Sequence, residues 1–284
     1  MPTLRVATSA GSPVGVLLQH WRQARRMSQL ALAVEAEVSS RHISFIETGR
    51  ARPSREMVLH LAGALEVPLR ERNALLLAAG YAPIYREVGL EAPEADAVRW
   101  ALAAILRRQE PYPAVVMNRS WDLLEANAAG ARFFGFLLGD GARTGPANVI
   151  RMMLDPNGLR PYVANWEAVA TALLDRVGRE AIGGALDGAT GELLDEVMTF
   201  PGVRHLRRTP GASATLSPVV PVTFEKPPFR FSFFSTVTTL GTPQDALLQE
   251  LRIESFFPLD EETERNAMAL AAEKSPAAHS GPSG

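Results

Sequence analysis

The sequence predicts two domains: an all-α domain of five short helices, then an α+β domain of about five antiparallel strands with helices on one face. Three observations lead to this. The length of 284 residues exceeds what one small domain needs. Apolar residues recur at helical spacing in the first eighty or so positions and at alternate positions in the last third. A hydrophobic fraction of 46% and a charged fraction of 21% are typical of globular proteins.

The helical domain is predicted from residues that start helices. Serines able to cap a helix N-terminus precede four apolar segments, and Pro68 lies in the first turn of a fifth. The predicted caps are Ser12, Ser28, Ser39 or Ser40, and Ser54. Because only a few residues separate the segments, the helices must pack as one compact domain.

The second domain is predicted from a change of period. Residues 114–118 and 121–126 indicate a hairpin, and alternation within 216–224 and 229–237 indicates two further strands. Residues 247–257 continue this pattern, although 247–251 could equally begin as helix. The helices expected between and before these strands are 97–109, 128–138, 162–179 and 191–199, and a glycine-rich loop leads to residues 148–154.

The domain boundaries follow from these segments and from charge. We assign residues 1–82 to the helical domain, 83–96 to a linker, 97–262 to the α+β domain, and 263–284 to a largely disordered tail that is helical at first. Residues 1–82 hold ten Lys and Arg against six Asp and Glu, a net charge of +4, whereas the remainder carries −6. This asymmetry favours an N-terminal domain that binds a polyanion.

Several function classes find no support in the sequence. The absence of cysteine excludes disulfides, thiolate metal sites and a cysteine nucleophile. The five histidines lack metal-site spacing, and neither a P-loop nor a GxSxG motif occurs, so we expect no metal and no enzymatic activity. No apolar run approaches the roughly 18 residues of a membrane span, and the first twelve residues lack a signal-peptide core. We therefore expect no membrane insertion and a cytoplasmic location.

Residues 28–54, SQLALAVEAEVSSRHISFIETGRARPS, resemble the helix-turn-helix of the Cro/CI, or XRE, class of DNA-binding domains. Leu32-Ala33 supplies a large and then a small residue where the two helices approach. Ile43 and Ile46 anchor the recognition helix. Glu37 stands at the turn position that usually holds glycine. A residue other than glycine in a left-handed turn costs about 1 kcal/mol.

The resemblance implies that the recognition helix enters the major groove of double-stranded DNA. Arg41 could pair with guanine and Phe45 could touch a thymine methyl, whereas Gln29, Arg50 and Arg52 suit phosphates. The alternative for Arg41 is a solvated surface charge, and Glu47 is expected to tie the recognition helix to Arg22 or Arg25. The candidate DNA-binding residues are Gln29, Ser39, Ser40, Arg41, His42, Ser44, Phe45, Arg50 and Arg52.

Three separated blocks extend the resemblance over nearly the whole chain. They are residues 41–83, which continue the helix-turn-helix, then PYPAVVMNRSWDLLEANAAG, then NVIRMMLDPNGLRPYVANW. Together they are similar to the MmyB-like transcription regulator family, in which an XRE-type domain precedes a PAS-like ligand-binding domain. The third block departs at Asp155-Pro156-Asn157-Gly158, where the family usually has a His-Pro-Asp-Gly-like sequence.

The family resemblance implies that the second domain binds a small apolar molecule, plausibly a fatty acid, with no other cofactor. Arg151 or Asn127 could hold a carboxylate headgroup. The candidate ligand-binding residues are Asn127, Phe133, Phe134, Arg151, Met152, Trp166, Val222, Phe224, Phe231 and Phe233. The apolar ones could equally be ordinary core. A second domain that only dimerises or binds a protein partner is the rival hypothesis, and a homodimer is expected because such domains usually read two half-sites.

Overall fold

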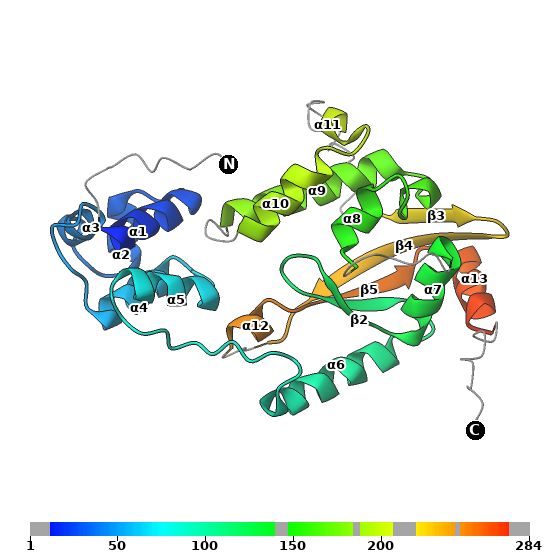
Figure 1. Cartoon of the computed structure of the whole chain (residues 1–284), viewed down its shortest axis with the longest axis horizontal. Coiled ribbons are helices and arrows are strands. Elements are labelled where there is room, and N and C mark those ends of the chain that lie inside the picture. The colour runs from blue at the N-terminus through cyan, green and yellow to red at the C-terminus, as the bar shows by residue number, and fades with distance from the viewer. Residues whose placement is uncertain (1–11, 140–146, 184–187, 207–219, 242–244, 273–284) are drawn as a thin grey trace, which may run out of the picture. The chain divides into compact units, whose positions relative to one another are not determined.

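A computed structural model describes residues 12–139, 147–183, 188–206, 220–241 and 245–272 (Figure 1). The chain divides into two compact units. The first comprises Met1–Val88 with Ile182–Leu186 and Thr242–Gln249, and the second comprises Gly89–Ala181, Asp187–Gly241 and Glu250–Gly284.

The first unit contains the five predicted helices. They are α1 (Pro13–Ala24), α2 (Gln29–Glu35), α3 (Ser40–Glu47), α4 (Arg55–Ala64) and α5 (Leu69–Ala78). Ser12, Ser28, Ser39 and Ser54 cap the first four, each accepting a backbone N–H with its side chain. Buried leucine, isoleucine and valine side chains from all five helices surround Trp21 and form one core. The predicted helix-turn-helix is α2 followed by α3.

Two close backbone arrangements hold this helix pair. Glu37 in the turn has a φ of 50°. The position is therefore left-handed, as expected, although the residue is not glycine. Gly15 of α1 lies against the end of α3, and a Cβ on it would be 2.4 Å from the carbonyl oxygen of Ile46. Only glycine allows α1 to approach α3 this closely.

A short helix from the second half of the chain belongs to the first unit. This helix, α12 (Ala246–Gln249), lies between two strands in sequence. The Gln249 side chain accepts a hydrogen bond from the Leu69 N–H at 2.7 Å. Asp245 accepts one from the Val88 N–H at 2.8 Å, and Ala246 N–H donates to the Arg86 carbonyl at 2.9 Å. Part of the predicted linker, at Arg86 and Val88, therefore forms hydrogen bonds with the N-terminal end of α12. The segment 247–257, for which helix and strand were both possible at its start, begins as helix.

The second unit is built on five antiparallel strands in the order β2-β1-β5-β4-β3. They are β1 (Ala114–Met117), β2 (Leu123–Ala126), β3 (Val222–Lys226), β4 (Phe229–Thr238) and β5 (Arg252–Pro258). The predicted α+β fold with about five antiparallel strands is confirmed. The first predicted residues of β3, up to 219, lie outside the described part of the chain.

The register sets the apolar face of this sheet. Phe224 pairs with Phe231 and Val222 pairs with Phe233 across β3 and β4. On the central strand β5, Glu254 lies between Val115 of β1 and Val237 of β4. Side chains alternate along a strand, so Glu254 shares its face with Val115 and Phe256.

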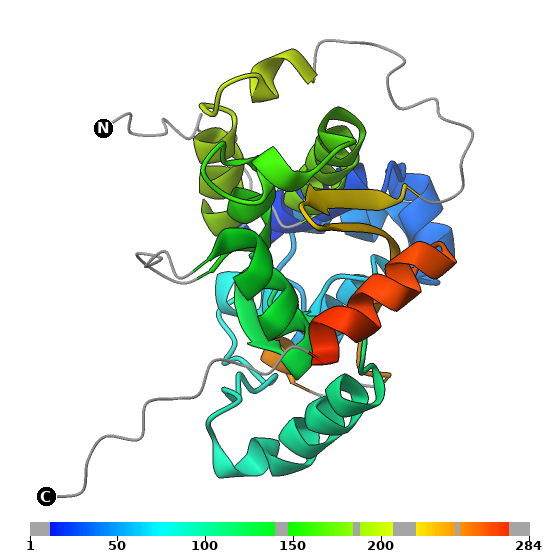
Figure 2. The ribbon, with the colours of Figure 1, turned by 90° about the vertical axis from the view of Figure 1, so that its right-hand side faces the viewer.

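Helices cover this apolar face and carry most of the core (Figure 2). The helices of the second unit are α6 (Asp96–Arg108), α7 (Ala128–Leu138), α8 (Val149–Leu154), α9 (Trp166–Gly183), α10 (Gly188–Val197), α11 (Val203–Leu206) and α13 (Glu261–Ala272), with 3-10 turns η1 (Pro93–Ala95) and η2 (Arg160–Tyr162). Buried residues of α7, α8, α9 and α10 join the face of Phe224 and Phe231 in one cluster. α13 packs beside α7 and along β4.

Two details differ from the sequence-based expectation. Val116 and Ile253 point away from the main cluster yet are buried, because α6 packs against β1 on that side. Helices therefore cover part of both sheet faces. The predicted tail begins inside α13, where Thr263, Ala267 and Leu270 are buried, so residues up to 272 complete the domain. Residues 273–284 lie outside the described ranges.

Candidate functional site

The outer face of α3 carries most of the residues predicted to touch DNA. Ile43, Ile46 and Glu47 are buried, which leaves Ser40 and Arg41 exposed on the other side of the helix. His42, Ser44 and Phe45 are half-buried. Ser39 caps α3 by accepting a hydrogen bond from the His42 N–H at 3.2 Å. The helix N-terminus therefore presents short polar side chains and one arginine outward.

Two guanidinium groups lie near the Phe45 ring. The Arg41 guanidinium carbon is 5.1 Å from the centre of the Phe45 ring, and that of Arg50 is 6.0 Å away. Both distances fall within the range of a cation–π interaction. The ring thus keeps two predicted DNA-binding arginines on the same surface as the start of α3.

A buried ion pair fixes the other side of α3 to α1. Arg22 Nε donates to Glu47 Oε1 at 2.7 Å and Arg22 Nη2 donates to Oε2 at 2.8 Å. The expected tie between Glu47 and Arg22 is confirmed. Gln29 Nε2 also donates to Glu47 Oε2 at 2.8 Å, so the amide predicted for a phosphate already has a protein partner. Arg52, which is exposed, donates to the Ala79 carbonyl at 3.2 Å.

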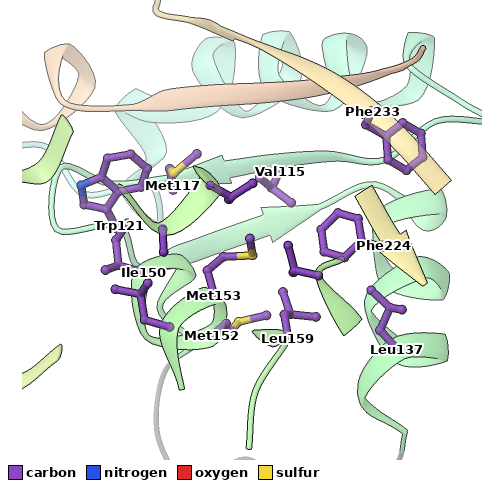
Figure 3. Close-up of a cluster of buried hydrophobic side chains, with 14 of the residues drawn as sticks. Val115, Met117, Trp121, Leu137, Ile150, Met152, Met153, Leu159, Phe224 and Phe233 are labelled. Atoms are coloured by element: carbon purple, nitrogen blue, oxygen red, sulfur yellow. The ribbon is translucent and has the colours of Figure 1, made fainter. Parts of the chain in front are cut away.

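The second unit contains an apolar cavity of about 60 Å³ between the sheet and α8 and α9. Figure 3 shows Met152, Met153 and Leu159 gathered beneath the strands that carry Val115 and Phe224. The lining consists of Val115, Leu123, Phe134, Val149, Met152, Met153, Leu159, Val169, Leu173, Val222, Phe224, Glu254 and Phe256. Four predicted ligand residues are among them: Phe134, Met152, Val222 and Phe224.

Three predicted aromatic residues belong to the hydrophobic core and do not line the cavity: Phe133, Phe231 and Phe233. Phe133 is 2% exposed, and its ring packs edge-on against those of Phe224, Phe231 and Phe233. The distances between ring centres are 5.1, 5.2 and 5.6 Å. Trp166 also lies outside the lining, with its indole N–H donating to the Met153 carbonyl at 3.0 Å.

The two residues proposed for a carboxylate headgroup are engaged elsewhere. Asn127 caps α7, where its side-chain oxygen accepts from the Ala114 and Gly130 N–H groups at 2.9 and 2.8 Å. Arg151 forms a two-hydrogen-bond ion pair with Glu196 at 2.8 and 2.7 Å. This pairing raises the pKa of Arg151 and lowers the pKa of Glu196. Neither residue lines the cavity.

Glu254 is the polar lining residue that the sequence-based analysis missed. The Ser235 hydroxyl donates to Glu254 Oε1 at 2.6 Å. Burial raises the pKa of Glu254, and the hydrogen bond from Ser235 and the nearby Arg176 oppose that shift. Alternation in the segment 247–257 indicates an apolar face made of Leu247, Leu251, Ile253 and Phe257. Ile253 and Phe257 lie on the face of β5 opposite Glu254. Both faces of this central strand are covered, so alternation alone could not select the one with the cavity.

The Asp155–Gly158 turn has a structural role next to the cavity. A Cβ on Gly158 would lie 2.4 Å from the Met152 carbonyl oxygen. The same carbonyl accepts the Leu159 N–H at 2.6 Å, and Asp155 accepts the Asn157 N–H at 2.8 Å. The turn therefore folds back on α8 and directs Leu159 into the lining.

The described ranges contain neither a metal-binding cluster nor a membrane-spanning helix. No group of three or more His, Asp or Glu there could hold a metal ion. No helix in the same ranges is long and apolar enough to span a bilayer.

Comparison with known proteins gives matches to both units. The family profile of the MmyB-like transcription regulator ligand binding domain matches residues 98–270, and a helix-turn-helix domain profile matches residues 13–75. RghRB of Bacillus subtilis (strain 168), an uncharacterized HTH-type transcriptional regulator, is 31% identical over 131 residues, which are 44% of this chain and 91% of RghRB.

One solved structure, an RNA-binding light-oxygen-voltage receptor, aligns with 92% of this chain and 63% of its own. Its sequence identity to this chain is 14%, and the TM-score is 0.26.

Proposed function

The chain belongs to the family of MmyB-like transcription regulators, and from this premise we propose that a small apolar molecule in its second domain controls how tightly its first domain binds DNA. It is a transcription regulator with a helix-turn-helix DNA-binding domain and a ligand-binding domain. We further propose that it works as a homodimer in the cytoplasm and catalyses no reaction.

The cavity of the second domain carries this proposal. All its lining residues except Glu254 are apolar, as is common for small-molecule sites. An aliphatic chain entering it would gain about 0.8 kcal/mol for each buried CH₂. The acyl chain of a fatty acid is one such chain. Its carboxylate would find no arginine or lysine among the described lining residues, and Arg151, which does not line the cavity, is paired with Glu196.

The segment 245–258, which contains α12 and β5, connects the cavity to the DNA-binding unit through the chain itself. β5 carries Glu254 and Phe256 in the cavity lining and starts just after α12, which belongs to the DNA-binding unit. Asp245 starts α12 by accepting the Leu247 N–H at 2.9 Å, and it also holds the Val88 N–H. A ligand that displaces β5 would therefore act on the position of α12. Coupling free energies of this kind are typically 1–3 kcal/mol, or about 5–150-fold in affinity.

We expect DNA affinity to differ by at least about fivefold between two forms of the protein. One form is stripped of bound lipid, and the other is reloaded with a lipid extract of the organism that encodes it. In the variant Asp245→Ala this difference should fall to less than about twofold, because α12 loses both its cap and its link to Val88. Titration of labelled duplex with each form measures the effect. Asp195→Ala, an exposed change on α10, is the control.

Native mass spectrometry of the purified protein tests the premise of this experiment. A bound small molecule supports ligand control. An empty protein whose DNA affinity does not respond to the extract would refute it and favour a second domain that serves interaction alone.

The DNA surface makes a separate prediction. Arg41→Ala should weaken binding to the preferred sequence by about 1–3 kcal/mol while sparing random duplex, because Arg41 is exposed at the start of α3 where base edges are read. Arg50→Ala should weaken both alike, as loss of a phosphate contact does. Arg265→Ala, at an exposed position of α13 in the second unit, should change neither. Titration against a selected sequence and a scrambled one decides this, and equal losses for Arg41→Ala would make Arg41 a phosphate contact.

A further inference from the structure

One ionisable side chain lines the apolar cavity of the second domain. Of the described residues in the lining, twelve are apolar and the remaining one is Glu254. It lies on β5, the central strand of the sheet, between Val115 and Val237 of the neighbouring strands. Glu254 is half-buried, and it lines the cavity together with apolar neighbours.

The surroundings of Glu254 leave it able to accept a further hydrogen bond. Its described hydrogen bond is the one from the Ser235 hydroxyl to Oε1, at 2.6 Å. A carboxylate has about four lone-pair positions, so most of its accepting capacity is not used by Ser235. Arg176 lies close enough to lower the pKa of Glu254, but its guanidinium stacks on Trp121 at 4.7 Å and does not line the cavity.

This arrangement discriminates between ligand headgroups. A bound carboxylate would place a second negative charge beside Glu254 in apolar surroundings, or would require one proton to be taken up and shared between the two groups. A hydroxyl or an amine would instead donate a hydrogen bond to Glu254, and hydrogen bonds to an ionised acceptor are the stronger kind. The ligand's polar end thus meets an acceptor.

We propose that Glu254 determines the ligand class: the cavity selects an apolar molecule whose polar end is a hydrogen-bond donor, a hydroxyl or an amine, over one that ends in a carboxylate. The proposal rests on the proposed function of the second domain as a ligand sensor. The raised pKa of Glu254 agrees with a carboxyl group that burial has partly desolvated and that has no cationic side chain beside it among the described lining residues.

The test uses three eight-carbon probes that share one chain and differ in headgroup: octan-1-ol, octylamine and octanoic acid. Binding to the lipid-free full chain is measured by calorimetry at slightly alkaline pH. We expect the alcohol and the amine to bind at least about tenfold more tightly than octanoate. In Glu254→Gln, amine affinity should fall about tenfold and octanoate affinity should rise, so that the gap closes. Glu225→Gln makes the same change in an exposed ion pair with Arg230 and should keep the wild-type order.

The possible outcomes separate this inference from the function it rests on. Octanoate binding as tightly as octan-1-ol to the wild-type chain would overturn the role of Glu254 and leave the ligand sensor intact. The same holds if Glu254→Gln keeps the wild-type ratios. If none of the three probes binds, the inference and the ligand part of the proposed function both fall. The wild-type ratio decides the matter even where Glu254→Gln does not fold.

Discussion

Glu47→Ala is expected to destabilise the DNA-binding unit by about 3–5 kcal/mol, because it leaves the buried Arg22 guanidinium without its counter-charge. The Arg22 and Glu47 side chains are 10% and 3% exposed. Arg22 would keep its hydrogen bond to the Met27 carbonyl at 2.9 Å, which does not neutralise its charge. Gln29 would also lose its acceptor. Since this pair joins α1 to α3, the orientation of the recognition helix should loosen and DNA affinity should fall.

Hydrogen exchange read peptide by peptide measures the effect. Peptides from α1 and α3 should lose protection in Glu47→Ala, whereas peptides from the five-stranded sheet should not change. The double variant Arg22→Met, Glu47→Leu is the informative control. It removes both charges and fills the space, so it should be more stable than Glu47→Ala alone. Equal losses in the two proteins would contradict a charge-based explanation and indicate lost packing.

Phe133→Ala is expected to destabilise the second unit by a similar amount, about 3–5 kcal/mol. The Phe133 side chain is 2% exposed and meets four rings edge-on, those of Phe134, Phe224, Phe231 and Phe233. The substitution leaves a void where α7 packs on β3 and β4. Such aromatic pairs contribute about 0.5–1.5 kcal/mol beyond their buried area, which places the loss toward the upper end of the range.

Chemical denaturation followed by circular dichroism measures this loss, with Phe234→Ala as the matched control. Phe234 is half-buried on the opposite face and stacks on Phe257 at 5.2 Å, so its truncation should cost clearly less. A loss for Phe133→Ala no larger than that for Phe234→Ala would show that Phe133 is not the centre of this core.

Features that depend on residues close together in the chain were predicted correctly from the sequence. Four serine caps and the spacing of Ile43 and Ile46 placed the helix-turn-helix, because a cap and its first turn lie within three residues. The predicted helix 128–138 also agrees with the observed bounds of α7, Ala128–Leu138. The alternation in β4 gave the correct apolar face, with Phe231 and Phe233 buried.

Contacts between residues distant in the chain determine which polar side chains face the cavity and which stabilise the fold. Arg151 looks like an anion-binding residue in the sequence, yet it pairs with Glu196, forty-five positions further on. Asn127 similarly serves Ala114, on a strand that packs beside α7. Glu254 gave no sign of its role, because both faces of β5 are buried and alternation then carries no information about side. Its exposure to the cavity depends on α8 and α9 lying over one face of the sheet, and no local pattern in the chain records that packing.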